Sequence, residues 1–237
     1  MAKNIQINYN NEPSYKICIR NNFDELSSLI KSNINKSYDN VCIVSDSTVS
    51  KLYLDSVQKE LSQIFENITS FVFPAGEESK NLDTVQKLYE HLILSRFTRN
   101  SLLIALGGGV VGDLTGFTAS TYLRGIDFIQ VPTTLLSQVD SSIGGKTGVD
   151  FNQFKNMVGA FYMPKLVYMN ISTLNTLDDT NFICGMGEVV KSALIQNKDF
   201  YSWLKLNHEL INNKDDSTLE KMIYQCCLIK GHVVEID

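Results

Sequence analysis

The chain has 237 residues, of which 43% are hydrophobic and 20% charged, and its formal net charge is −5. This composition is ordinary for a soluble globular protein, and the net negative charge gives no general attraction for nucleic acid or for an anionic membrane. No apolar stretch approaches the roughly 20 residues that a membrane span needs, and the N-terminal segment lacks the features of a signal peptide, so we expect a cytoplasmic protein with neither nucleic acid nor membrane as a partner.

Short apolar runs recur along the first two thirds of the chain and predict strands. They are YKICIR (15–20), VCIVSD (41–46), ITSFVF (68–73), SLLIAL (101–106), DFIQVP (127–132) and LVYMN (166–170). Stretches with helical spacing lie between most of them, for example residues 82–93. Strands that alternate with helices predict a parallel sheet covered on both faces, which is a doubly wound α/β domain.

The character of the sequence changes beyond Leu174. Residues 181–206 and 217–236 read as helices, separated by the polar segment INNKDDS (211–217). The chain is longer than one average domain and shorter than two, if a domain has about 150 residues. We therefore predict an α/β domain over residues 1–170 and an incomplete, all-helical C-terminal domain over 171–237.

The cysteines give no sign of a disulfide framework or a zinc ribbon. Their number is odd, most are embedded in apolar segments, and none forms a C-x-x-C pair; they are Cys18, Cys42, Cys184, Cys226 and Cys227. This pattern predicts buried, reduced thiols.

A glycine-rich segment follows the strand predicted at 101–106. Gly107, Gly109 and Gly112 match the G-x-G-x-x-G fingerprint, and they stand between a predicted strand and a predicted helix. Glycine is needed in this motif because a Cβ would keep the pyrophosphate of a dinucleotide from the backbone N–H groups at the helix N-terminus. The segment predicts a dinucleotide site.

The acidic residue that usually accompanies this fingerprint is not where it is expected. Asp127 has the right spacing after the glycines, but it opens its strand instead of closing it. Asp46 is better placed, because it ends the strand 41–46 and ligands gather at the carboxyl ends of parallel strands. From the residues alone, the favoured role of Asp46 is to cap the helix that follows it.

Other polar residues admit a structural role beside a functional one. The turn of Gly76, Glu77 and Lys80 reads first as a solvated loop with a local ion pair, and Thr133 and Thr134 after a proline read equally as a helix start. Lys146, Lys155 and Asn156 suit a small phosphorylated polyol as well as they suit a surface loop. Glu188 and Lys191 lie three apart on one helix face, where an ion pair is the favoured interpretation. The three histidines read as structural or exposed residues: His91 lies on a predicted apolar helix, His208 follows a helix that contains a tryptophan, and His232 lies in KGHVVEID.

Five segments resemble the 3-dehydroquinate synthase family, an NAD- and metal-dependent cyclase of the shikimate pathway. They are GEESK (76–80), LGGGVVGDLTGFTASTYLRG (106–125), FIQVPTTLLSQVDSSIGGKTGV (128–149), KNMVGAFYMP (155–164) and GMGEVVK (185–191). Weaker similarity extends over nearly the whole chain. The resemblance implies a Rossmann-like doubly wound sheet followed by a helical domain.

The resemblance also implies roles for individual residues. It makes Lys146, Asn156, Lys191 and Lys230 substrate contacts, has Asp140 contact cofactor and substrate, and carries Arg124 to the phosphate across a homodimer interface. It makes Glu188 a ligand of a divalent metal, zinc or cobalt. The family continues past this chain with two histidine ligands, so only one of three expected ligands is present and we expect a fragment that is inactive alone. The residues implied for NAD are Asp46, Gly76, Glu77, Lys80, Gly108, Gly109, Val110, Gly112, Asp113, Thr133, Thr134, Lys146, Lys155, Thr173, Leu174, Asn175 and Thr176.

The activity implied by the resemblance is the cyclisation of a sugar phosphate, 3-deoxy-D-arabino-heptulosonate 7-phosphate, to 3-dehydroquinate with elimination of phosphate. NAD oxidises a ring hydroxyl transiently and is regenerated in each cycle. The alternatives are another sugar-phosphate cyclase, a metal-dependent polyol dehydrogenase, or a non-catalytic NAD-binding module, because fold alone does not fix function.

Overall fold

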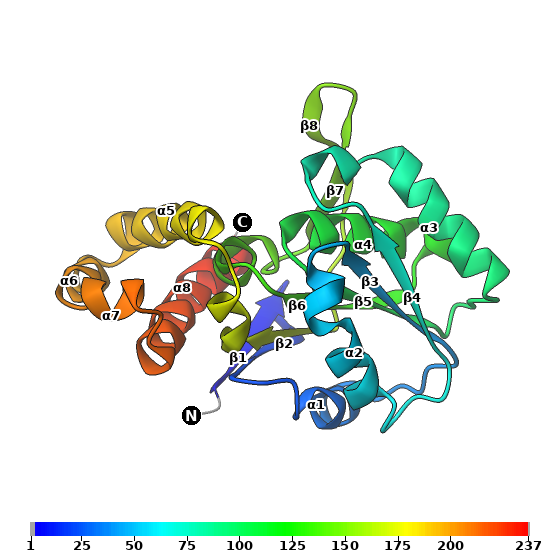
Figure 1. Ribbon diagram of the computed structural model, residues 1–237, viewed down its shortest axis with the longest axis horizontal. Helices are drawn as coiled ribbons and strands as arrows, with labels where there is room; N and C mark the ends of the chain where they lie inside the picture. The colour runs from blue at the N-terminus through cyan, green and yellow to red at the C-terminus, as the bar shows by residue number, and fades with distance from the viewer. Residues whose placement is uncertain (1–2, 237) are drawn as a thin grey trace.

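A computed structural model describes residues 3–236 as a mixed α/β structure built on a seven-stranded sheet (Figure 1). The strand order is β1-β2-β9-β6-β5-β3-β4; β1 pairs antiparallel with β2, and the other pairs are parallel. A separate antiparallel hairpin, β7–β8, projects away from the sheet. The strands are β1 (Lys3–Tyr9), β2 (Glu12–Arg20), β3 (Val41–Asp46), β4 (Ile68–Phe73), β5 (Leu102–Gly107), β6 (Asp127–Pro132), β7 (Lys146–Phe151), β8 (Phe154–Phe161) and β9 (Leu166–Asn170).

Helices cover both faces of the sheet, which explains why its central strands are apolar throughout. Along β5, Leu103 and Ala105 pack with α3 (Leu82–Leu94) and α4 (Gly109–Thr121) on one face. Leu102 and Ile104 pack with α1 (Leu26–Asn33) and α2 (Val49–Leu61) on the other. The doubly wound architecture predicted from the alternating pattern is therefore confirmed.

The last part of the chain is helical and packs on the β1–β2–β9 end of the sheet (Figure 1). Its helices are α5 (Asp179–Gln196), α6 (Lys198–Leu206), α7 (His208–Asn212) and α8 (Asp216–Ile236). They share one hydrophobic core with β1 and β2, in which Ile17 and Ile19 pack with Met222 and Cys226. The division near residue 170 stays a prediction, because this core continues across it.

The structure differs from the sequence predictions in three places. The helix predicted at 181–206 is broken at Asn197, whose side chain caps α6 by accepting a hydrogen bond from the Phe200 amide at 2.9 Å. The polar segment 211–217 is not a simple spacer, because α7 and α8 extend into it. Strands β1, β7 and β8 were not predicted.

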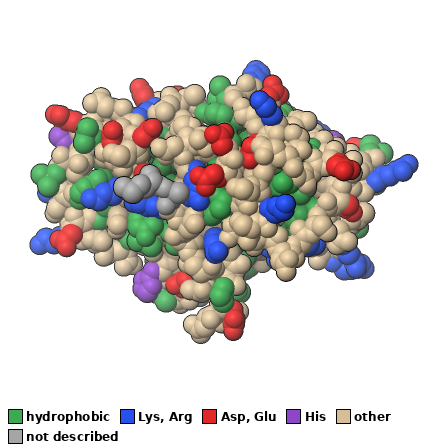
Figure 2. Space-filling view, turned by 90° about the horizontal axis from the view of Figure 1, so that it is seen from below, with side chains coloured by type: hydrophobic (Ala, Val, Ile, Leu, Met, Phe, Trp, Pro, Cys, Tyr) green, Lys and Arg blue, Asp and Glu red, His purple; other side chains and the backbone are tan. Residues whose placement is uncertain are grey.

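The cysteine prediction holds for four of the five residues. Cys18, Cys42, Cys226 and Cys227 are buried free thiols, whereas Cys184 is a free thiol exposed on α5, so the prediction of burial is wrong there. Within residues 3–236, no helix is long and apolar enough to cross a membrane. Acidic and basic side chains are intermingled over the face seen in Figure 2.

Candidate functional site

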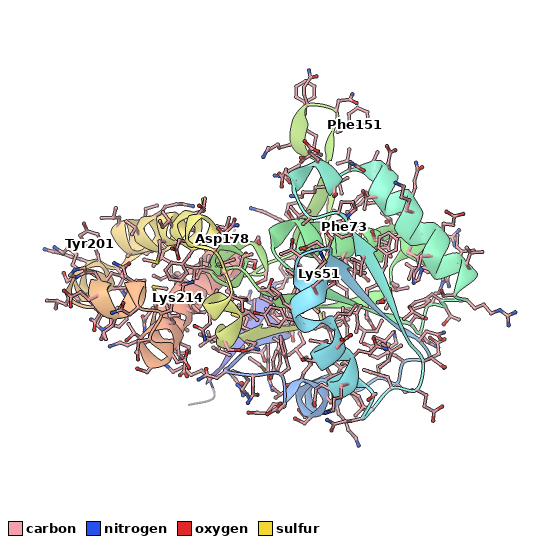
Figure 3. The ribbon with its side chains drawn as sticks, viewed as in Figure 1. Lys51, Phe73, Phe151, Asp178, Tyr201 and Lys214 are labelled. Atoms are coloured by element: carbon pink, nitrogen blue, oxygen red, sulfur yellow. The ribbon has the colours of Figure 1, made fainter. Side chains whose placement is uncertain are left out.

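The carboxyl ends of β3, β5 and β6 open onto a cavity of about 650 Å³, which we call the strand-end cavity. Parallel strands point these ends to one edge of the sheet, so residues far apart in sequence meet there. The N-terminal turn of α5 closes the far side, where Asp178 caps the helix by accepting a hydrogen bond from the Asn181 amide at 3.0 Å (Figure 3). Of the residues predicted for a dinucleotide, those that line this cavity are Asp46, Gly76, Glu77, Lys80, Gly108, Gly109, Val110, Asp113, Thr133, Thr134, Thr173 and Thr176.

Five residues predicted for the dinucleotide do not line the strand-end cavity. Gly112 is buried against β6, where a Cβ would lie 2.6 Å from Gln130 Oε1, so this glycine permits close packing of α4 on the sheet. Leu174 is fully buried and Asn175 is exposed. Lys146 lines a neighbouring cavity, and the exposed Lys155 pairs with Glu77 at 3.1 Å.

The glycine segment has the geometry that its sequence predicted. Gly107 ends β5, Gly108 is the N-cap of α4 in an extended conformation, and Gly109 is the first residue of the helix. A Cβ on Gly109 would lie 3.0 Å from Ser141 Oγ, in a wall of the cavity. The positive end of the α4 dipole thus faces a space that side chains do not fill, which is a suitable place for an anion.

Thr133 gives an independent sign that this cavity holds a polar ligand. Its side chain lines the cavity and is 4% exposed, and its hydroxyl lacks a hydrogen-bond partner within residues 3–236. Buried polar groups are rarely left unpaired, so a hydroxyl in this position favours a ligand with hydrogen-bonding groups. The residues present fit a dinucleotide.

Asp46 has both of the roles that its sequence position allowed. Its Oδ1 accepts hydrogen bonds from the Thr48 and Val49 amides, at 2.8 and 2.9 Å, and so caps α2. It also lines the strand-end cavity. Asp127, at the other end of β6, is held by Lys36 and Tyr38, at 2.7 and 3.1 Å, and takes no part in the cavity wall.

A second cavity of about 480 Å³ lies beside the first, against the β7–β8 hairpin; we call it the hairpin cavity. Asp113, Asp140 and Ser141 line both cavities, which therefore adjoin. The predicted substrate residues Asp140, Lys146, Asn156 and Lys230 all line the hairpin cavity. Lys230 on α8 donates to Asp140 Oδ1 at 2.5 Å, which joins the helical part of the chain to this wall.

Lys80 connects the walls of the two cavities. Its ammonium lies 2.5 Å from Asp113 Oδ2 and 2.6 Å from Asn156 Oδ1, and the residue is 5% exposed. Burial raises the pKa of the Asp113 carboxyl above its ordinary value, while the Lys80 ammonium acts in the opposite direction. The local ion pair considered for the turn at 76–80 is therefore a buried, tertiary one.

Two of the predicted substrate residues, Arg124 and Lys191, line neither cavity. Arg124 is exposed on the turn after α4. Lys191 pairs with Glu188 at 2.8 Å, the ion pair favoured from the residues alone. That hydrogen bond raises the pKa of Lys191 above its ordinary value, and the Asp140 carboxylate adds to the rise.

The predicted metal centre is not assembled by the described residues. Within residues 3–236 no group of three or more His, Cys, Asp or Glu side chains is arranged to hold a metal ion. Catalytic zinc sites usually have three protein ligands and an open position. Glu188 alone, already paired with a lysine, does not fit that requirement.

Several cavity residues were missed from the sequence. Ser141 lines both cavities, Thr147 lines the hairpin cavity, and Tyr53 lines the strand-end cavity with its hydroxyl against Thr176 Oγ1. Ser141 follows Asp140 directly and could have been chosen on that ground. Nothing local in the sequence marks Tyr53, which is brought in by the docking of α2.

Comparison with known proteins agrees with this geometry. Two family models match, described as 3-dehydroquinate synthase N-terminal over residues 70–184 and 3-dehydroquinate synthase C-terminal over residues 185–237. The chain is 44% identical over 234 residues to a 3-dehydroquinate synthase of Acetivibrio thermocellus, covering 98% of this chain and 64% of the relative. It is 45% identical over 238 residues to one of Francisella tularensis subsp. tularensis, covering 100% and 65%. The chain thus spans a little under two thirds of the length of these relatives.

Solved structures with the same fold include two cyclases. A 2-deoxy-scyllo-inosose synthase complexed with carbaglucose-6-phosphate, NAD+ and Co2+ aligns with a TM-score of 0.84 at 27% identity, covering 98% of this chain and 62% of the other. A 2-epi-5-epi-valiolone synthase from Streptomyces hygroscopicus, with NAD+ and Zn2+ bound, aligns with a TM-score of 0.83 at 25% identity, covering 98% of this chain and 64% of the other. A glycerol dehydrogenase from Schizosaccharomyces pombe aligns with a TM-score of 0.69 at 18% identity, covering 92% of this chain and 59% of the other. This likeness supports the fold alone.

Proposed function

The chain belongs to the 3-dehydroquinate synthase family, and we propose that it carries the NAD site and part of the substrate site of that activity. The reaction is conversion of 3-deoxy-D-arabino-heptulosonate 7-phosphate to 3-dehydroquinate and phosphate. One observation carries the proposal: a dinucleotide-sized cavity at the N-terminus of α4 adjoins a cavity lined by two lysines and an asparagine. Such an arrangement places a cofactor beside an anionic substrate.

NAD supplies a hydride acceptor and donor in this proposal, and the protein supplies its position. The α4 N-terminus, from Gly108 to Val110, receives the pyrophosphate, and the ligand gives the Thr133 hydroxyl the hydrogen-bond partner that it lacks among residues 3–236. The remaining proposed contacts either line the same cavity or, in the case of Gly112, Lys146, Lys155, Leu174 and Asn175, lie outside its wall and are kept from the family resemblance. They are Asp46, Gly76, Glu77, Lys80, Gly112, Asp113, Thr134, Lys146, Lys155, Thr173, Leu174, Asn175 and Thr176.

The hairpin cavity receives the substrate. Lys146 and Asn156 present an ammonium and an amide to an anion, and Lys230 and Asp140 present a paired cation and carboxylate to its hydroxyl groups. Donors of this kind stabilise a phosphate and orient the ring that must face the nicotinamide. Lys191 stands nearby on α5 and completes the proposed set.

Arg124 gives a reason to propose a homodimer. It is exposed and outside both cavities of its own chain, so it contacts the substrate phosphate only if a second copy brings it there. We therefore keep Arg124 as a substrate residue of the partner copy. A cytoplasmic location is a further proposal.

The described residues do not form a complete site for a metal ion. Glu188 is one proposed ligand, and residues 3–236 supply no second or third. The roles assigned to the chain are to bind the dinucleotide, to hold the sugar phosphate against it, and to keep water from the contact between them.

Binding and redox measurements on the 237-residue chain test the proposal. We expect NAD to bind in a one-to-one ratio, and a phosphonate analogue of the substrate to bind in competition with inorganic phosphate. Net accumulation of NADH with a polyol would favour the dehydrogenase, since the cyclase regenerates its cofactor. Failure of both NAD and the phosphonate to bind would contradict the proposal.

A further inference from the structure

Lys80 is a buried cation on which three segments of the chain converge. It follows the short helical turn Glu77–Ser79 after β4, and its ammonium reaches Asp113 on α4 and Asn156 on β8. The separations along the chain are 33 and 76 residues. A buried lysine is retained when its charge is paired and hydrogen-bonded, and the Lys80 ammonium pairs with the Asp113 carboxylate and donates to Asn156 Oδ1.

The backbone beside Lys80 makes a second connection to the hairpin. The Asp150 amide donates to the Lys80 carbonyl at 2.8 Å, and Asn81 and Asp150 form an isolated parallel bridge. Asp150 Oδ1 in turn accepts a hydrogen bond from the Asn156 amide at 2.7 Å. Asn156 has a left-handed backbone conformation, with φ of 58°. The hydrogen bond of its side chain with Lys80 and that of its amide with Asp150 hold it in this conformation.

The two halves of the hairpin are supported differently. At its base, Thr147 packs so closely on α4 that a Cβ at Gly116 would lie 2.4 Å from Thr147 Cγ2. Further out, Phe151 and Phe154 are about half exposed and Met157 is 69% exposed, and Figure 3 shows Phe151 on the part that projects from the molecule. The outer half therefore depends on the contacts around Lys80 for its position.

The residues joined by Lys80 belong to both cavities. Lys80 lines the strand-end cavity, Asn156 lines the hairpin cavity, and Asp113 lines both. The turn at 76–80 is joined to the segment around Asn156 by the buried Lys80 ammonium, by the backbone bridge at Asn81 and Asp150, and by the exposed ion pair of Glu77 with Lys155.

We propose that Lys80 is a positioning residue that couples the two cavities. A dinucleotide in the strand-end cavity holds the 76–80 turn, and Lys80 transmits that order to Asp113 and Asn156. Cofactor and anionic substrate therefore bind with positive cooperativity. This inference rests on the proposed function. It adds a linkage between the two sites, and linkage requires that each ligand strengthen the other by the same factor.

The test is a pair of calorimetric titrations on the full 237-residue chain, NAD with and without a saturating phosphonate analogue of the substrate. We expect the analogue to tighten NAD binding in the parent chain, and Lys80→Met to abolish most of that factor. Lys80→Arg, which keeps a cation, should restore part of it. Lys87→Met removes an exposed lysine from α3 and should leave the factor unchanged. If Lys80→Met does not fold, Lys80→Gln replaces it.

Hydrogen exchange on the ligand-free chain gives a readout that needs no ligand. Amides of residues 150–157 should exchange at least tenfold faster in Lys80→Met than in the parent, while those of α4 keep their protection. Equal exchange in the two proteins, or an unchanged coupling factor, overturns the proposed linkage. If the parent binds neither NAD nor the phosphonate, the proposed function fails, and the exchange rates still decide whether Lys80 holds the hairpin.

Discussion

The phenolic oxygen of Tyr15 on β2 accepts a hydrogen bond from the backbone amide of Gly144 at 2.8 Å, although 129 residues separate them. Burial raises the pKa of Tyr15 above its ordinary value, so the hydroxyl remains protonated. Gly144 has a φ of +102°, a conformation that glycine adopts readily, and Lys146 of the hairpin cavity follows two residues later. An interior strand thus anchors the segment that presents this lysine.

The first prediction concerns that anchor. Tyr15→Phe should lower the free energy of unfolding by about 1 kcal/mol, the usual net contribution of one hydrogen bond. It should also weaken binding of a substrate phosphonate several-fold, because the segment before Lys146 gains freedom. NAD affinity should stay within about twofold, since neither residue lines the strand-end cavity. Chemical denaturation measures the free energy of unfolding, and calorimetry measures the phosphonate and NAD affinities. Unchanged phosphonate binding would show that Tyr15 does not support the substrate site.

Gly109→Val tests the glycine segment. The new side chain would enter the cavity wall, where the Cβ alone lies 3.0 Å from Ser141 Oγ. Overpacking and lost charge-assisted hydrogen bonds should cost about 2–4 kcal/mol of NAD binding, a loss of thirtyfold or more. Gly187→Ala is the matched control, because a Cβ there meets no atom within 4 Å. Equal NAD affinity in Gly109→Val and the parent, with the fold intact, would remove this segment from the dinucleotide site.

The fold was largely predictable because its signals are local. Strands β3, β5 and β6 are apolar runs bounded by turn residues, and burial on both faces requires that pattern. Strand β8 could not be predicted because its residues are mostly exposed and it has no buried apolar face. Strand β1 does carry a signal, because Ile5 and Ile7 alternate with polar residues and are buried, so this short half-buried strand could have been recognised.

The candidate site was likewise only partly predictable from the sequence. Gly109, Thr133 and Asp46 could be selected because each follows or ends a strand, and parallel strands bring such ends together. The contact of Lys80 with Asp113 and Asn156 could not be predicted from the sequence, because it depends on how a turn, a helix and a hairpin pack together. Local spacing suggested only a surface ion pair for Lys80, and tertiary packing made it a buried one.

Lys146 and Asn156 provide the test of the hairpin cavity. Lys146→Ala and Asn156→Ala should each weaken phosphonate binding tenfold or more, since a charge-assisted donor contributes about 1.5–3 kcal/mol. NAD affinity measured alone should fall less than phosphonate affinity in Lys146→Ala, because Lys146 lines the hairpin cavity and not the strand-end cavity. Lys205→Ala, which removes an exposed lysine from α6, controls for loss of general positive charge. Unchanged phosphonate affinity in both alanine variants would exclude this cavity as the anion site.

Asp127 should affect stability and not cofactor binding. Burial tends to raise its pKa, but the hydrogen bond from Lys36 and the charges of Lys165 and Lys36 outweigh this and hold the pKa below its usual range. A carboxyl with a depressed folded-state pKa contributes stability above its unfolded pKa of about 4, and that contribution is lost as the pH falls through the folded pKa.

Asp127→Asn should therefore lower the free energy of unfolding near neutral pH by about 1 kcal/mol, a small value because the partner lysines are partly exposed. The difference between variant and parent should shrink as the pH falls below about 4. Urea titrations across this range measure it, with NAD affinity as the control. A difference that grew at low pH would have the wrong sign for this assignment.

The last prediction is that the 237-residue chain holds zinc or cobalt weakly. Affinity for these ions depends on the number and geometry of ligands, and within residues 3–236 no three suitable side chains converge. Glu188 is already engaged by Lys191 at 2.8 Å, so a metal would have to displace that ammonium. After dialysis the protein should retain far less than one equivalent of metal by elemental analysis, and Glu188→Gln should leave the amount unchanged. NAD binding should persist without metal, because the strand-end cavity is built from α4 and the strand ends and does not include Glu188. One equivalent of tightly held metal that is lost in Glu188→Gln would mean that other residues join Glu188 in a way the described arrangement does not contain.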